Sequence, residues 1–162
     1  MDIDPDHVRF TVPAAVVKDS VDLLAEPGAA GYEGSVLWIG ELRDRASAQV
    51  TRVYRPEQMA FAGEAGLAVE VTERGLTDLI SSLSGDEVVL GRLHTHGNDD
   101  VAHSSLDDRN LIVAHAGALS IVVPWFAFDG IDLVRCGVHI LSSVHRWRRL
   151  PPSETSERFM IR

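Results

Sequence analysis

The stretch V-V-L-G-R-L-H-T-H-G-N-D-D-V-A-H-S-S-L-D, Val88 to Asp107, joins an apolar segment to a run of imidazoles, carboxylates and hydroxyls. Its first part, Val88 to His96, has the apolar and β-branched content that is typical of a buried strand. The polar residues that follow lead into a helix, which we expect to begin near Ser104. A strand, a polar connection and a helix in this order bring several potential metal ligands close together.

His94 and His96 occupy alternate positions of the predicted strand, so their side chains point to the same face, with Cα atoms about 6.6 Å apart. One metal ion can therefore bind both imidazoles. Asp107 lies in the first turn of the following predicted helix and offers a third ligand. Two histidines and one carboxylate leave a fourth position open for water, which is the composition of a catalytic zinc site.

The spacing of these residues, His-x-His, then seven residues, then Ser-x-x-Asp, resembles the JAMM motif of the JAB/MPN metalloprotease family. The matching residues here are His94, His96, Ser104 and Asp107. The resemblance implies Zn²⁺ as the cofactor, held by the two histidines and the aspartate, and a catalytic serine, Ser104, that stabilises the oxyanion. Gly97 stands where the family usually has proline, which indicates a more mobile loop after the second histidine.

The same resemblance implies an upstream glutamate that serves as the catalytic base. Glu33 precedes the apolar segment Val36 to Ile39 and lies seven residues before Gly40, as the family pattern requires. Glu41 is a second candidate for this role, but it follows Gly40 and lacks that offset. We therefore expect Glu33 to be the base.

Other residues of the stretch have simpler interpretations. Ser104 to Asp107 also fits a helix capping box, and this role is compatible with a role in catalysis. His103 is expected to be solvated, and the alternatives are a fourth metal ligand or a hydrogen bond to one of the other ligands. His115 is expected near the end of the helix that begins at Ser104, close to the negative end of its dipole. Cys136 is expected to be a buried, inert thiol.

The pattern along the rest of the chain indicates an α/β fold built on a single mixed β-sheet flanked by helices. The resemblance implies the JAB/MPN architecture, which is similar to that of the cytidine deaminases. Further strands are predicted at 8–12, 36–39, 48–54, 67–71, 119–128, 131–142 and 147–150, with helices at 13–28 and after Thr72. Residues 59–66 are predicted to be a loop. Residues 1–152 are interpreted as one metalloprotease domain, and 153–162 as a loosely held C-terminal tail.

Composition excludes several classes of function. The net charge of -9 argues against nucleic acid or an anionic membrane as the main partner. The acidic N-terminus and the lack of a long apolar segment predict a cytoplasmic protein. Cys136 is the only cysteine, so any metal must be held by His, Asp or Glu. The basic run 145–149 fits either an edge strand whose charges discourage strand pairing or a patch that docks an acidic partner.

These features together predict a zinc-dependent isopeptidase or peptidase. The resemblance implies a ubiquitin-like or sulfur-carrier protein as substrate, with an extended C-terminal tail that a sheet edge binds by strand addition. The enzyme would cut such a protein from its conjugate or from a C-terminal extension. Two alternatives stay open, a non-catalytic MPN-like scaffold for protein interactions and a metal-binding sensor.

Overall fold

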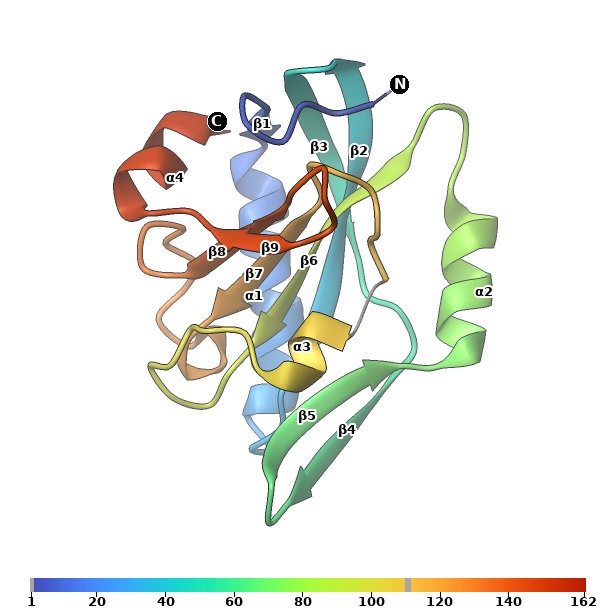
Figure 1. Cartoon of the computed structure of the whole chain (residues 1–162). Helices are drawn as coiled ribbons and strands as arrows, with labels where there is room; N and C mark the ends of the chain where they lie inside the picture. Colours follow the sequence, from blue (N-terminus) through green and yellow to red (C-terminus); the bar gives the residue numbers. More distant parts are fainter. Residues whose placement is uncertain (1, 110–111) are drawn as a thin grey trace.

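The computed structural model describes residues 2–109 and 112–162, which form a mixed α/β fold (Figure 1). Within this part of the chain, eight strands form the main sheet, in the order β10-β1-β3-β2-β6-β7-β8-β9. In that order the strands are β10 (Phe159–Ile161), β1 (Arg9–Val12), β3 (Ser47–Tyr54), β2 (Ser35–Asp44), β6 (Val88–Thr95), β7 (Leu119–Val123), β8 (Gly137–Leu141) and β9 (Trp147–Arg149). The predicted mixed sheet is confirmed.

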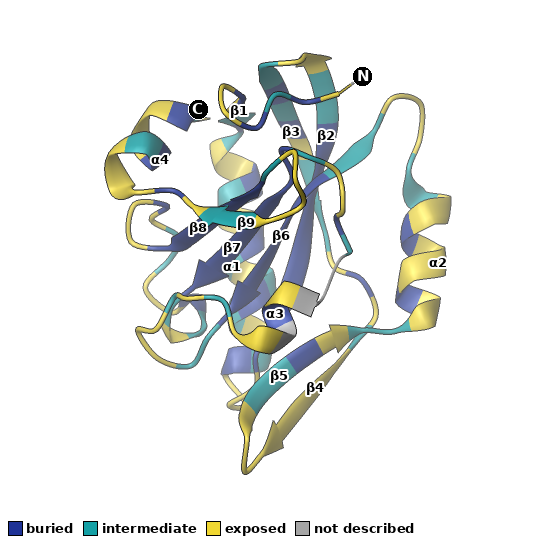
Figure 2. Ribbon diagram, in the orientation of Figure 1, coloured by how far each residue is buried: buried dark blue, intermediate teal, exposed yellow. Residues whose placement is uncertain are grey.

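The centre of the sheet follows the predicted pairing. β2 is antiparallel to β3, which confirms the hairpin expected from residues 36–39 and 48–54, and it is also antiparallel to β6. β6 and β7 run parallel, whereas β7, β8 and β9 are joined in antiparallel pairs. Figure 2 shows that these central strands are largely buried. A largely buried strand therefore holds His94, and His96 directly follows its end.

Helices cover both faces of the sheet because β2 is apolar on both sides. Trp38 faces α1 (Ala14–Gly28) and donates its indole N–H to the hydroxyl of Ser20 at 2.9 Å. Leu37 and Ile39 point the other way and pack with Leu79 of α2 (Glu73–Ser82). α2 begins as predicted, since Thr72 accepts a hydrogen bond from the third residue beyond it.

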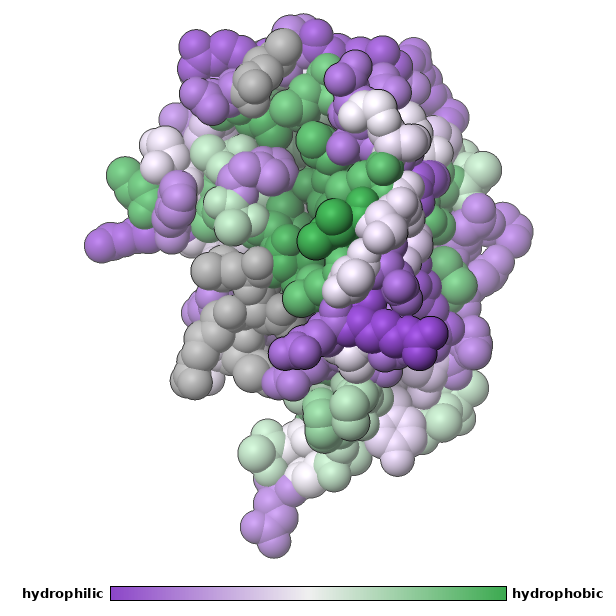
Figure 3. Space-filling model, turned by 90° about the vertical axis from the view of Figure 1, so that its right-hand side faces the viewer, coloured by the Kyte–Doolittle hydropathy of each residue, from purple (hydrophilic) through white to green (hydrophobic). Residues whose placement is uncertain are grey.

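The side of the molecule that carries α2 presents a broad apolar surface (Figure 3). Leu76 and Ile80 of this helix are exposed. Among the residues that the structure describes, no helix is both long and apolar enough to cross a membrane.

Residues 59–66, expected to form a loop, belong mainly to a hairpin outside the main sheet. β4 (Gln58–Gly63) and β5 (Gly66–Val71) are antiparallel and form a second, two-stranded sheet, so the prediction of a single sheet is wrong in this respect. Most of β4 is exposed on both faces. Its side chains consequently lack the apolar alternation from which a strand is predicted.

The expectation of a loosely held tail after residue 152 is also wrong. α4 (Pro152–Arg158) is followed directly by β10, which pairs in parallel with β1. The ring of Phe159 stacks on that of Phe10 at 5.1 Å, and the buried guanidinium of Arg158 donates to the backbone carbonyl of Val8. The consecutive prolines do not end the ordered chain, because proline is well accommodated in the first turn of a helix.

Several predicted elements are shorter than expected. β7 ends at Val123, because Pro124 follows it and the chain then turns through η1 (Trp125–Ala127). Residues 131–136 precede β8 and contain turns instead of a strand. The helix after Ser104 is α3 (Ser105–Arg109), so His115 is not near its end as predicted but lies in an irregular segment.

Candidate metal centre

The end of β6 brings two imidazoles together beside a cleft, and His96 is part of the cleft lining. His94 and His96 lie on the same face, with ring centroids 5.2 Å apart. His94 is fully buried, whereas His96 is partly exposed. Nδ1 of His96 lies 2.7 Å from the carbonyl oxygen of Asp100. Because a carbonyl oxygen only accepts hydrogen bonds, Nδ1 carries the hydrogen and Nε2 keeps the lone pair that a metal requires.

α3 brings Asp107 to the two histidines. Oδ1 of Asp107 lies 3.0 Å from Nε2 of His94, and Oδ2 lies 3.5 Å from Nε2 of His96. The Ser104 N–H donates to Oδ2 at 2.8 Å, while the Asp107 N–H donates to the Ser104 hydroxyl oxygen at 3.1 Å. The predicted capping box is therefore present. Since the hydroxyl accepts this bond, its own hydrogen remains available for donation into the cleft.

The three predicted ligands fit a divalent cation. Their ligand atoms lie within 4.8 Å of one another. Both ring nitrogens of His94 are buried, and neither has a hydrogen-bond partner in the described part of the chain, although Nε2 lies 3.0 Å from Oδ1 of Asp107. Such an unpaired nitrogen is costly unless something else binds it. Burial lowers the pKa of His94 to about 3, which keeps the ring in the neutral form that binds metals.

Glu33 lies in the same cleft, just before β2. The cleft has a volume of about 360 Å³, and Glu33, His96, Ser104 and Asp107 contribute to its lining. Glu33 is only 8% exposed, and burial raises its pKa to about 7. A carboxylate that titrates near neutral pH is suited to act as a base.

The alternative base, Glu41, is not part of the cleft lining. Its carboxylate forms an ion pair with Arg43 at 3.0 Å, and both side chains are partly exposed to solvent. Of the two glutamates considered from the sequence, the structure thus brings Glu33 and not Glu41 to the metal centre.

A buried guanidinium that the motif does not include lies behind the ligands. Arg92 donates to the hydroxyl of Ser35 at 3.0 Å, and one of its terminal nitrogens lies 3.9 Å from Oδ1 of Asp107. Its position two residues before His94 on the predicted strand is the signal that places it on the same face. Arg92 adds positive charge beside the carboxylates of Glu33 and Asp107 and lowers the pKa of Glu33, although less than burial raises it.

The loop after the second histidine is packed against an aromatic residue. A Cβ added to Gly97 would lie 2.7 Å from the ring of Phe126, which itself lines the cleft. The Phe126 N–H also donates to the carbonyl oxygen of His96 at 2.9 Å. Glycine at this position therefore makes room for the Phe126 ring.

Two further predictions concern single side chains. Cys136 is buried as expected, and burial raises the pKa of its thiol to about 12, which makes it a poor nucleophile at neutral pH. His103 is not solvated as predicted, because only 7% of its side chain is exposed. It contacts Ser120 and Asp108 instead of a solvent-facing surface.

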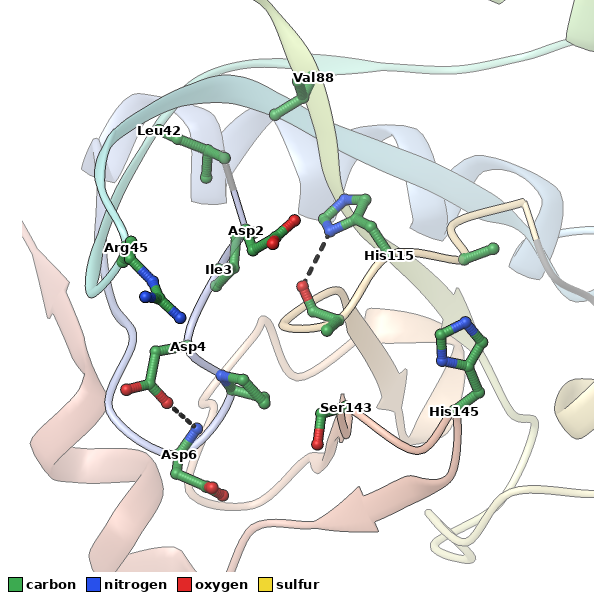
Figure 4. Close-up of a pocket in the computed structure, with 13 residues that line it drawn as sticks. Asp2, Ile3, Asp4, Asp6, Leu42, Arg45, Val88, His115, Ser143 and His145 are labelled. Atoms are coloured by element: carbon green, nitrogen blue, oxygen red, sulfur yellow. Dashed lines mark hydrogen bonds between the residues drawn. The ribbon is translucent and has the colours of Figure 1, made fainter.

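A larger hollow, the N-terminal hollow, lies around the start of β6, with a volume of about 840 Å³ (Figure 4). Asp4, Asp6, His115 and His145 are among the residues that line it. Asp4 accepts a hydrogen bond from the backbone N–H of Asp6 at 3.0 Å, and Nε2 of His115 lies 2.8 Å from the carbonyl oxygen of Val89. The side chains of Asp4 and His115 thus already have partners within the protein, and the labelled acids and imidazoles of the hollow do not point to a common centre (Figure 4).

Comparisons with known proteins show similarity in sequence to one protein and similarity in fold to a solved structure. No protein-family model matches the chain. A probable metalloprotease of Sinorhizobium fredii is 27% identical over 129 residues, which cover 79% of this chain and 78% of that protein. The chain is thus similar to a protein named as a metalloprotease.

The similarity to a solved structure extends over nearly the whole chain. A Desulfitobacterium hafniense protein, solved in solution, matches with a TM-score of 0.60 and 14% identity, and the match covers 94% of this chain and 92% of that chain. At this level of identity the likeness concerns the fold alone.

Proposed function

We propose that this protein is a zinc-dependent metallopeptidase. The observation that carries the proposal is the convergence of His94, His96 and Asp107 at a cleft whose lining includes His96, Asp107 and Glu33. The probable metalloprotease from Sinorhizobium fredii supports the same class of reaction. Zinc is the preferred cation because two imidazoles and one carboxylate are its usual ligands in hydrolases.

The chemistry follows from the positions of the side chains. Zinc, when bound, supplies a Lewis acid and lowers the pKa of water to about 7. Glu33 accepts a proton from the attacking water and later returns it to the leaving amine. Ser104 donates its hydroxyl hydrogen to the oxygen of the scissile carbonyl as negative charge develops there.

The substrate that we propose is a ubiquitin-like or sulfur-carrier protein with an extended C-terminal tail, as the resemblance to the JAMM motif implies. The JAB/MPN subtype is part of this proposal. One feature supports it, since Gly66 to Val69 of β5 line the cleft while this strand pairs only with β4 among the described residues. An extended tail can add to such a strand through backbone hydrogen bonds.

The test is cleavage of candidate ubiquitin-like fusions, read by mass spectrometry with and without a chelator. Glu33→Gln is expected to retain zinc and to lower turnover by about 100- to 10,000-fold, because the variant has lost the base. Glu41→Gln is the matched control and should keep wild-type turnover. Cleavage by Glu33→Gln at the normal rate would remove Glu33 from the mechanism, and cleavage that resists the chelator would exclude metal chemistry.

The scaffold alternative makes a different prediction about metal content. A non-catalytic interaction module has no need of the cation, whereas a peptidase of this type binds one equivalent. Less than half an equivalent of zinc in the purified protein, unchanged after zinc is added, would favour the scaffold.

A further inference from the structure

Three polar residues form a row across the sheet behind the metal centre. Arg92 of β6 is in register with Ser120 of β7, and Ser120 is in register with His139 of β8. Each of the three is buried, with an exposed fraction between 4% and 6%. Buried polar side chains of this kind require hydrogen-bond partners from the elements that pack on the sheet.

His103 supplies a partner for the middle of this row. Its Nε2 lies 2.8 Å from the hydroxyl oxygen of Ser120, and its Nδ1 lies 3.0 Å from a carboxylate oxygen of Asp108. An ionised carboxylate only accepts, so Nδ1 carries the hydrogen, and Nε2 accepts the Ser120 hydroxyl hydrogen. Burial lowers the pKa of His103, which favours this neutral form.

Aromatic packing holds the His103 ring in this orientation. The ring stacks on that of His139, with centroids 3.7 Å apart and planes inclined by 22°. The indole of Trp147 meets the same ring edge-on, at a centroid distance of 5.4 Å. His139 is itself held by its Nδ1, which lies 3.1 Å from the carbonyl oxygen of Gly137.

The order Asp108, His103, Ser120 has the connectivity of a serine hydrolase triad. A nucleophile must meet its substrate, however, and Ser120 is only 4% exposed within a central strand. A polypeptide carbonyl has no access to a hydroxyl in this position. The three groups consequently serve to hold the structure and not to attack a substrate.

The positions of His103 and Asp108 in the chain indicate which part of the structure their contacts hold in place. His103 directly precedes Ser104, and Asp108 directly follows Asp107, so the contacts enclose both ends of the capping box. α3 has five residues and is too short to be stable through its own hydrogen bonds. Contacts with the sheet must therefore fix the place of Asp107.

We propose that His103 is a positioning residue that ties the Ser104 to Asp107 turn to β7 and so sets the place of Asp107 beside His94 and His96. This inference rests on the proposed metal-dependent function. His103 acts through Ser120 and Asp108 and does not touch the cation. Its loss leaves the ligands present but displaces one of them.

The experiment compares zinc affinity and the visible spectrum of the Co²⁺-substituted protein across five variants, four with a single substitution and the double variant His103→Asn/Ser120→Ala. His103→Asn keeps an amide near the Nδ1 position, whereas His103→Gln keeps one near Nε2. Ser120→Ala removes the other end of the same contact. His7→Asn is the matched control, because His7 also contacts an aspartate through Nδ1, at 2.9 Å, but is exposed.

We expect His103→Asn and Ser120→Ala each to weaken zinc binding by about 10- to 100-fold, as is usual when a group that orients a ligand is lost. The Co²⁺ spectrum should change in both. His103→Gln, which keeps the contact to Ser120, should lose less zinc affinity. The double variant His103→Asn/Ser120→Ala should bind zinc no more weakly than the two single variants do. Wild-type affinity and an unchanged spectrum in His103→Asn would overturn the proposal.

Amide hydrogen exchange of the metal-free protein separates this inference from the proposed function. The N–H groups of Asp107 and Asp108 both donate to Ser104 and should exchange faster in His103→Asn and Ser120→Ala, but not in His7→Asn. A wild-type protein that binds no metal contradicts the proposed function, while unchanged exchange in both variants contradicts the role of His103.

Discussion

The cleft and the N-terminal hollow contain the same kinds of side chain but differ in what these side chains can bind. The hollow has more than twice the volume of the cleft and holds several aspartates and two histidines. Its acids and imidazoles lie mainly on irregular segments, and Asp4 and His115 bond to nearby backbone groups (Figure 4). In the cleft, a strand and a short helix direct three ligands toward one point and leave His94 without a partner. Two features therefore distinguish the candidate metal site: its ligand atoms converge, and a buried imidazole has no hydrogen-bond partner. Neither the volume of the cleft nor its residue types would single it out.

Removing one carboxylate from each region should separate them most clearly. We expect Asp107→Asn to weaken zinc binding by more than about 100-fold, beyond the 10- to 100-fold loss typical of residues that only orient ligands. Asp4→Asn, in the N-terminal hollow, should bind zinc as the wild type does. Calorimetric titration measures both affinities. Equal losses in the two variants would show that the hollow contributes to zinc binding as much as the cleft does.

The buried guanidinium of Arg92 allows a test of the charge balance in the cleft. Arg92→Met should lower the free energy of unfolding of the metal-free protein by about 3 kcal/mol, because the buried carboxylate of Asp107 then loses the guanidinium beside it. Zinc replaces that charge, so the variant should gain more stability on zinc addition than the wild type. Urea unfolding with and without zinc gives both values.

The matched control for this variant is Arg52→Met. Arg52 donates to both carboxylate oxygens of Glu87 at 2.9 Å in a half-buried pair, and its loss should cost about 1 kcal/mol regardless of zinc. The same zinc effect in both variants would contradict the charge balance proposed for the cleft.

The pH dependence of stability tests the burial of Glu33. The pKa of Glu33 is raised from 4.5 to about 7, so its contribution is complete below pH 4.5 and is lost as the pH rises through 7. Metal-free Glu33→Gln should therefore equal the wild type near pH 4 and exceed it near pH 8. After allowance for solvent in the cleft, the difference is about 1–2 kcal/mol.

Thermal or urea unfolding across this pH range gives the comparison. Glu41→Gln should show no such divergence, since Glu41 is solvated. Parallel pH curves for the wild type and Glu33→Gln would show that Glu33 is not buried as an unpaired acid.

The parts of the site that were predictable from sequence are those set by local geometry. Strand alternation places His94 and His96 on one face, and the capping pattern links Ser104 to Asp107. The same local patterns predict the central hairpin and the Thr72 cap. Each depends on residues close together in the chain or on a period that a strand or helix imposes.

The parts that were not predictable depend on contacts between distant segments. Burial of His103 requires the register of β7 and β8, which brings Ser120 beside His139. β10 requires β1 as a partner, and nothing in the polar residues that precede it indicates such pairing. Arg92 becomes part of the cleft only when α3 folds back over β6.

The close fit between Gly97 and Phe126 has a consequence for how sequences of this kind diverge. Because a Cβ at position 97 would meet the Phe126 ring, the two positions are expected to covary among homologues. A lineage that acquires proline at 97 must reduce the side chain at 126 or move its turn. Where the side chain at 126 is smaller, the cleft would be wider on that side.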